Sequence, residues 1–205
     1  MATRMTRAER SEQTRTELIG AARTVFLRRG FHGASLDEIS AEAGYTTGAV
    51  YSRFGGKDDL FLAVLDEHVD RRTRLYADAA LTAPDFESAG RKLVRAAVAA
   101  GDEEPGWTPL LMEFWTHAAA RDDLREAVLA RNDRQLDAVT ALHEQLAARH
   151  DIAFRRPPRE ILRAITAMAR GLGLERRLAP GDHLETMFED YAVALMLAFT
   201  ERSTG

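Results

Sequence analysis

The chain of 205 residues lacks cysteine, has only two lysines among its 28 basic residues, and contains no long hydrophobic run. Without cysteine it can form no disulfide, thiolate nucleophile or cysteine-ligated metal centre. The longest apolar stretch, residues 191–199, is far shorter than the roughly 20 residues with which an α-helix crosses a bilayer. No apolar segment follows the N-terminal arginines. We therefore expect no signal peptide, no membrane partner and a cytoplasmic protein.

The charges that the chain does carry are unevenly distributed. Hydrophobic residues make up 45% and charged residues 29%, which is typical of a globular protein, and the net charge is −4. Residues 1–57 hold nine basic against six acidic residues, whereas residues 58–205 hold nineteen against twenty-six. This distribution suits a protein that contacts phosphates with one end, although ordinary surface variation also produces asymmetries of this size.

The stretch Ser35–Lys57 predicts two short helices joined by a tight turn. Ser35 and Glu38 have the spacing of a capping box, so the first helix is expected to begin at Leu36. Gly44 is expected to end it, because a left-handed residue after a helix costs glycine little.

The second helix is expected to begin at Thr46 or Thr47 and to bury Val50 and Phe54. Its outer side would carry Thr47, Gly48, Tyr51 and Ser52. Such a pair is a helix-turn-helix, whose second helix fits the major groove of DNA. Glycine-turned helix pairs also occur in proteins that never touch DNA, so the pattern alone leaves both interpretations open.

The rest of the chain also has helical periodicity, interrupted by proline and glycine. Helices are expected at residues 11–29, 57–80, 86–100, 107–120, 122–150 and 157–178, with a last helix that Asp182 can cap. Residues 1–10 are expected to form a mobile arm, which can lie along phosphates or in a minor groove, with a frayed terminus as the alternative. Residues 101–106 are expected to form a charged loop. No segment shows convincing strand alternation. The predicted fold is all-α, with about nine helices.

Residues 44–60, G-Y-T-T-G-A-V-Y-S-R-F-G-G-K-D-D-L, resemble the signature of the TetR family of bacterial transcriptional regulators. The F-x-x-x-G-F segment at residues 26–31 and the S-L-x-x-I-S segment at residues 35–40 agree with it, so the resemblance covers about residues 11–65. Tyr45 departs from the small aliphatic residue that is usual at its position, and Ser40 replaces a common alanine.

The resemblance implies a set of DNA-binding residues: Ser35, Thr46, Thr47, Gly48, Tyr51, Ser52, Arg53 and Lys57. Thr47 and Gly48 would face base edges, and the others would meet phosphates. Two alternatives stay open. Tyr51 could be a core aromatic residue, and Arg53 could pair with an acidic neighbour in the head.

The resemblance also implies a helix-turn-helix head at residues 11–71, joined by a long helix to a ligand-binding and dimerisation domain at residues 72–205. Apolar residues on more than one side of the last helix support burial on two sides, against its own chain and a partner. The predicted interface between two copies comprises Ile161, Ile165, Leu172, Leu184, Met187, Tyr191 and Leu195. A fully buried helix in a monomer is the alternative.

The most aromatic stretch of the chain predicts a pocket for a small molecule. Its candidate lining, with polar residues from neighbouring segments, is Trp107, Leu110, Glu113, Phe114, His117, His143, Met168 and Arg170. Equally, such a stripe can be ordinary core. A buried Glu113 would favour a cationic ligand, and a buried Arg170 an anionic one.

Nothing in the sequence predicts an active site, a cofactor or a metal. Glu113 and His117 have a spacing that can hold a metal ion, but a helix salt bridge is the more common use of it. We therefore predict a regulator, rather than an enzyme, whose homodimer binds a palindromic double-stranded DNA operator and is released by a small molecule. The alternatives are an activator, a regulator without its own ligand, and a helical carrier or enzyme.

Overall fold

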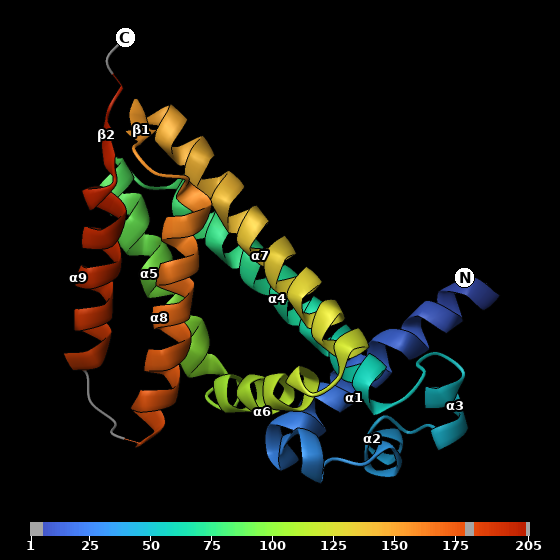
Figure 1. Cartoon of the computed structure of the whole chain (residues 1–205). Coiled ribbons are helices and arrows are strands. Elements are labelled where there is room, and N and C mark those ends of the chain that lie inside the picture. The colour runs from blue at the N-terminus through green and yellow to red at the C-terminus, as the bar shows by residue number, and fades with distance from the viewer. Residues whose placement is uncertain (1–5, 179–182, 204–205) are drawn as a thin grey trace. The chain divides into compact units, whose positions relative to one another are not determined.

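The computed structural model describes residues 6–178 and 183–203, and most of these are helical (Figure 1). The first helices are α1 (Arg7–Gly33), α2 (Leu36–Glu42), α3 (Thr47–Tyr51) and α4 (Lys57–Leu81). They are followed by α5 (Phe86–Glu103), α6 (Trp107–Ala119), α7 (Asp122–Arg149), α8 (Pro158–Leu178) and α9 (His183–Ala198). The all-α prediction is confirmed. The predicted cap at Asp182 lies outside the described residues.

The predicted N-terminal arm was wrong for residues 7–10, because α1 begins at Arg7, and residues 1–5 of this prediction lie outside the described residues. Thr6 and Glu9 form a capping box there, in which the Thr6 hydroxyl accepts from the Glu9 amide and the Glu9 carboxylate accepts from the Thr6 amide. At the other end, Gly30 adopts φ 74° and breaks the helical backbone, and a short helical piece then runs to Gly33.

Two further differences lie in the second half of the chain. Strands β1 (Ile152–Phe154) and β2 (Thr200–Arg202) pair antiparallel, although no strand was predicted. Three residues on each strand are too few to show a pattern of alternation, so only the contact between distant segments reveals them. Helix α5 also continues to Glu103, through part of the expected loop.

The chain folds into two compact units, and each unit is built from two separate segments of the sequence. The first contains the chain up to His68 together with Pro109–Val128, and the second contains Val69–Thr108 and the chain from Leu129 onward. Helices α4, α6 and α7 therefore each contribute to both units. The predicted domain boundary, between residues 71 and 72, lies close to the first of these division points and stays a prediction.

An aromatic cluster forms the core of the first unit. Phe31 lies in edge-to-face contact with Phe61 and Phe114, at ring-centroid distances of 5.4 and 4.9 Å. Phe61 and Phe114 stack at 4.0 Å, and Phe26 contacts Phe61 at 5.1 Å. All four side chains are almost completely buried. They join α1, α4 and α6, so the residues of α6 from Pro109 onward belong to the core of the head.

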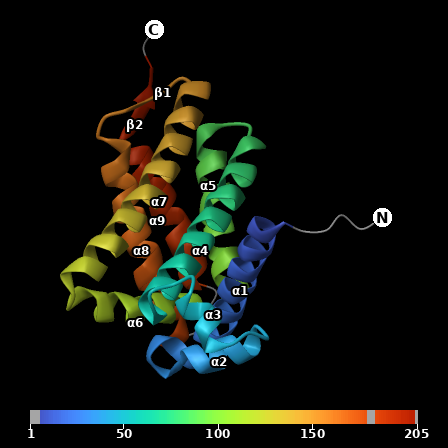
Figure 2. The ribbon, with the colours of Figure 1, turned by 90° about the vertical axis from the view of Figure 1, so that its right-hand side faces the viewer.

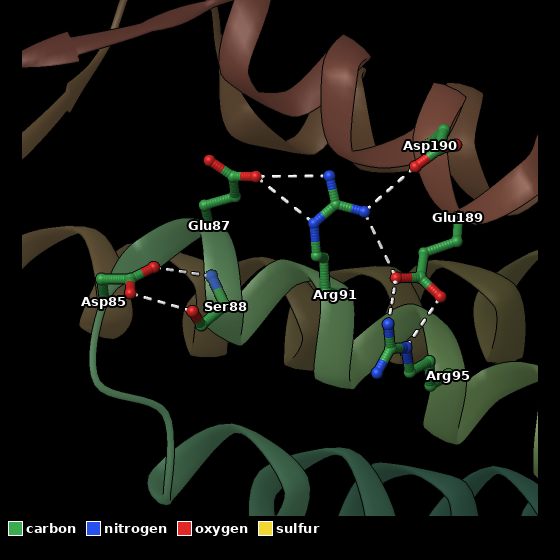
Figure 3. A network of polar contacts seen from close by, with 7 residues as sticks. All are labelled: Asp85, Glu87, Ser88, Arg91, Arg95, Glu189 and Asp190. Carbon is green, nitrogen blue, oxygen red and sulfur yellow. Dashed lines mark hydrogen bonds and ion pairs between the residues drawn. The ribbon is translucent and has the colours of Figure 1, made fainter. Parts of the chain in front are cut away.

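In the second unit, α9 packs along both α5 and α8 (Figures 1 and 2). Phe188 and Met196 of α9 are buried in the core. A polar network joins α5 to α9 at the edge of this contact (Figure 3), where Arg95 donates to the Glu189 carboxylate at 2.8 and 2.9 Å. Arg91 reaches Glu189 at 3.3 Å and Asp190 at 3.1 Å. The hydrogen bond from Arg95, followed by that from Arg91, lowers the pKa of Glu189.

Candidate nucleic-acid interface

Helices α2 and α3 form the predicted helix-turn-helix, and local interactions set its geometry. The Ser35 hydroxyl accepts from the Glu38 amide at 3.1 Å, which confirms Ser35 as the cap of α2. Gly44 adopts φ 73° after α2, and the Tyr45 amide then donates to the Ser40 carbonyl at 2.8 Å. The turn therefore requires a residue that tolerates a left-handed conformation at position 44.

The two sides of α3 differ in exposure as predicted. Val50 is fully buried and Phe54, just after the helix, is nearly so, whereas the Tyr51 side chain is 61% exposed. The alternative of a core tyrosine at position 51 is therefore wrong. Gly48 and Ser52 are also exposed. Helix α3 thus presents a polar outer surface with one aromatic hydroxyl, over an apolar inner side that fixes its position.

The threonines at the start of α3 have different environments. Thr46 is the N-cap residue, but its side chain makes no capping hydrogen bond. Thr47 is half-buried, and its hydroxyl donates to the Asp37 carboxylate of α2 at 2.6 Å. The Thr47 methyl and the hydroxyl's remaining lone pairs are what this residue can offer to a base edge.

Tyr45, the residue that departs from the signature, ties the turn to α1. Its hydroxyl donates to the Glu17 carboxylate and accepts from the Thr14 hydroxyl at 3.4 Å. The hydrogen bond from Tyr45 and, to a smaller extent, the one from Gln13 lower the pKa of Glu17. The side chain is thus directed to α1. No signal in the sequence revealed this contact, because it joins residues 28 positions apart.

Lys57 has an internal role that the sequence did not reveal. Its ammonium donates to the carbonyls of Phe31 and Ala34 at 2.9 and 3.0 Å, and lies 4.7 Å from the centre of the Phe31 ring. It therefore satisfies carbonyls at the end of α1. A phosphate contact by Lys57 stays a prediction and would have to share the ammonium with these carbonyls.

Arg53 follows α3 and has no acidic partner among the contacts found in the described residues. One guanidinium nitrogen, Nη1, donates to the Ala49 carbonyl at 3.3 Å and to the Ser52 hydroxyl at 2.9 Å. The Nε atom is buried and has no hydrogen-bond partner in this part of the structure. These contacts do not support the predicted alternative of an ion pair within the head.

Four of the candidate ligand residues belong to the first unit, where they have structural partners. The Glu113 carboxylate accepts from the amides of Phe31 at 3.0 Å and His32 at 2.7 Å. The His117 Nε2 atom lies 3.0 Å from a carboxylate oxygen of Asp58. The other two residues, Leu110 and Phe114, are buried in the same unit. Glu113 and His117 are therefore engaged with other groups, so the predicted salt bridge between them was wrong.

The other four candidate ligand residues, Trp107, His143, Met168 and Arg170, belong to the second unit. Burial lowers the pKa of His143, whose Nδ1 lies 2.8 Å from the Val139 carbonyl, so the neutral imidazole donates there. Burial also lowers the pKa of Arg170 to about 10. The eight residues are thus divided between the two units. Within the described residues, no group of three or more His, Asp or Glu side chains has an arrangement suited to a metal ion.

The residues predicted for the interface between two copies also differ in exposure. Ile161 and Leu184 are only 5% and 6% exposed and pack inside their own chain, so they offer little surface to a second copy, and the interface stays a prediction. Met187 and Tyr191 are exposed, and Ile165, Leu172 and Leu195 are half-buried. Leu174 and Leu178 of α8, which were not among the predicted interface residues, are also exposed. Searched over the described residues, the helices include none that is both long and apolar enough to span a bilayer.

Comparison with known proteins places this geometry among bacterial regulators. Residues 18–64 match the family model for bacterial regulatory proteins of the tetR family. The HTH-type transcriptional activator FasR of Mycolicibacterium smegmatis is 40% identical over 89 residues, which are 43% of this chain and 39% of FasR. This chain thus spans well under half of that relative. The HTH-type transcriptional regulator Mb3439c of Mycobacterium bovis is 30% identical over 183 residues, which cover 88% of this chain and 92% of Mb3439c.

The fold has a counterpart in the crystal structure of SCO4454, a TetR-family transcriptional regulator from Streptomyces coelicolor. The TM-score is 0.72 at 24% sequence identity, and the superposition covers 92% of this chain and 96% of SCO4454. At this identity the likeness concerns the fold alone.

Proposed function

Because the chain belongs to the TetR family of bacterial regulatory proteins, we propose that it is a transcriptional regulator that binds double-stranded DNA through α3. The observation that carries this proposal is the division of α3 into two sides. Val50 holds the helix against the core while Tyr51, Gly48 and Ser52 stay accessible. A helix fixed in this way can enter a major groove with its polar side foremost. Its relatives are regulators rather than enzymes, in agreement with the absence of a predicted active site.

The active form would be a homodimer that pairs through α8 and α9. Exposed apolar side chains on these helices support a partner there, namely Leu174, Leu178, Met187 and Tyr191. Two-fold symmetry would then require a near-palindromic operator with half-sites about one turn of DNA apart.

A small molecule bound in the second unit would control the affinity for DNA. In the principal form of the proposal, the protein is a repressor that leaves its operator when this small molecule binds. Of the two residues proposed to select the ligand's charge, Glu113 is engaged with backbone amides, and the half-buried Arg170 donates to the Asn132 side chain at 3.4 Å. Because operator and ligand would favour different states, each must weaken binding of the other by the same factor.

An activator is the second candidate, since the related FasR carries that name. A reporter gene under the regulator's own promoter separates the two forms. Deleting the regulator raises expression if it represses and lowers expression if it activates.

The proposal is tested by measuring the affinity of the full chain for upstream DNA with Tyr51→Ala and Tyr51→Phe. A tyrosine hydroxyl that meets a phosphate contributes about 1.5–3 kcal/mol, so Tyr51→Phe should weaken binding at least about tenfold. Tyr51→Ala should weaken it further, while circular dichroism stays unchanged because the side chain is exposed. Wild-type affinity in both variants would reject α3 as the DNA-binding helix.

A further inference from the structure

A concave site of about 340 Å³ lies in the first unit, next to the C-terminal end of α3. Its lining comes from the first turns of α1 and from the two residues after α3, and comprises Arg7, Arg10, Ser11, Thr14, Ser52 and Arg53. We call it the arginine cup. Four of these six residues precede the region that matches the family model, which begins at residue 18.

The arginine cup is strongly cationic. Three guanidinium groups line it and no carboxylate does. On α1, Glu9 binds the Thr6 amide and Glu17 binds Tyr45 and Gln13, while Glu12 lies two residues from Arg10 and so projects from a different side of the helix. The cup therefore gathers basic side chains from α1 and from the end of α3.

A second observation points to a missing partner. The Nε atom of Arg53 is buried and, among the described residues, has no hydrogen-bond partner. Its Nη1 is held by the Ala49 carbonyl and the Ser52 hydroxyl, which fix the plane of the guanidinium. Among the described residues no hydrogen bond uses the Nη2 atom of Arg53, so this fixed guanidinium keeps a donor that suits an oxygen of a phosphate group.

We propose that the arginine cup binds one backbone phosphate of the DNA, and that Arg7 and Arg10 of α1 join the signature residues Ser52 and Arg53 in this contact. This inference rests on the proposed DNA-binding function. The cup adjoins the exposed end of α3, since Ser52 and Arg53 directly follow Tyr51. A phosphate at the edge of the groove that α3 enters would therefore come within reach of α1. Such a contact fixes the position of the head on the duplex but carries no sequence information.

The variants Arg7→Ala and Arg10→Ala, alone and combined, test the arginine cup without endangering the fold. Both positions lie in the first turns of α1, where a positive charge opposes the helix dipole. Alanine is also the residue most favourable to a helix. The matched control is Arg156→Ala, which removes the same charge from an exposed position in the second unit.

The measurement is the affinity of the full chain for operator and shuffled duplexes between about 50 and 200 mM salt. The slope of log affinity against log salt should become shallower by about 0.9 per lost phosphate contact, or about 1.8 for a dimer with two cups. The double variant should weaken binding to both duplexes alike, so the preference for operator is retained. The Arg156→Ala control should keep the wild-type slope.

The other possible results distinguish a failure of the arginine cup from a failure of the proposed DNA-binding function. A double variant with the slope and affinity of Arg156→Ala overturns the arginine cup while leaving the DNA-binding function intact. A wild-type chain that binds neither duplex overturns the proposed function itself. Free phosphate is the other source of the same chemistry. Saturable binding of inorganic phosphate that requires Arg7 and Arg10, with an unchanged salt slope on DNA, would assign the cup to a small anion instead.

Discussion

Replacement of Glu113 by alanine should destabilise the first unit, because this carboxylate caps a break in α1. Gly30 interrupts the helix at φ 74°, and the amides of Phe31 and His32 then begin a new helical piece. Amides at such a position have no partner within their own helix. The carboxylate of Glu113 accepts from both of them, at 3.0 and 2.7 Å.

The magnitude follows from these two hydrogen bonds. A hydrogen bond to a charged group contributes about 1.5–3 kcal/mol, and partial access of water to this site brings the sum toward the lower end. We expect Glu113→Ala to lower the free energy of unfolding by about 3 kcal/mol. Glu113→Gln keeps one carbonyl acceptor and should lose about half as much.

Urea unfolding of the full chain, followed by tryptophan fluorescence, measures this effect. Trp115 belongs to the first unit and Trp107 to the second, so a Trp107→Phe background leaves a reporter in the unit of interest. Glu126→Ala is the control, since this exposed carboxylate lies in the same unit on α7. Equal midpoints for Glu113→Ala and Glu126→Ala would refute the proposed capping role.

Two further predictions concern the second unit. Burial lowers the pKa of His143 below its ordinary value of 6.5, so the folded state binds fewer protons than the unfolded state. The contribution of His143 to the free energy of unfolding should therefore be full above about pH 6.5 and should decrease as the pH is lowered through this value. The variant His143→Gln should then show a smaller difference between its urea midpoints at pH 7.5 and 5.5 than the wild type does. An unchanged difference would show that His143 is not the group responsible. Separately, Tyr191→Glu places a charge on the exposed surface of α9 and should convert the proposed dimer to a monomer in sedimentation analysis, while Tyr191→Phe remains dimeric. A dimeric Tyr191→Glu protein would move the interface elsewhere.

The helix-turn-helix could be predicted because its signals are local. The Ser35 cap lies three residues from the amide that it binds, and Gly44 supplies its own unusual dihedral angle. The same holds for the buried residues at α3, since Val50 and Phe54 are four residues apart and the Phe54 amide donates to the Val50 carbonyl just after the helix.

What could not be predicted depends on residues that are distant in the sequence. Lys57 and Glu113 both meet the turn after Gly30, from 26 and 82 residues away, and no periodicity predicts such partners. Both had been assigned to bound molecules because their chemistry suits phosphates and ligands. In a folded chain, backbone carbonyls and amides compete for the same ammonium and carboxylate groups. The strand pair β1–β2 was missed for the same reason.

The most direct test of the central claim is a nuclease-protection experiment with the full chain on the DNA upstream of its own gene. A dimer that reads DNA with α3 should protect one near-palindromic segment, whose two halves lie about one helical turn apart. Tyr51→Ala should lose this protection at concentrations that saturate the wild type. No protected segment, or protection that Tyr51→Ala leaves unchanged, would contradict the assignment of α3 as the helix that reads the operator.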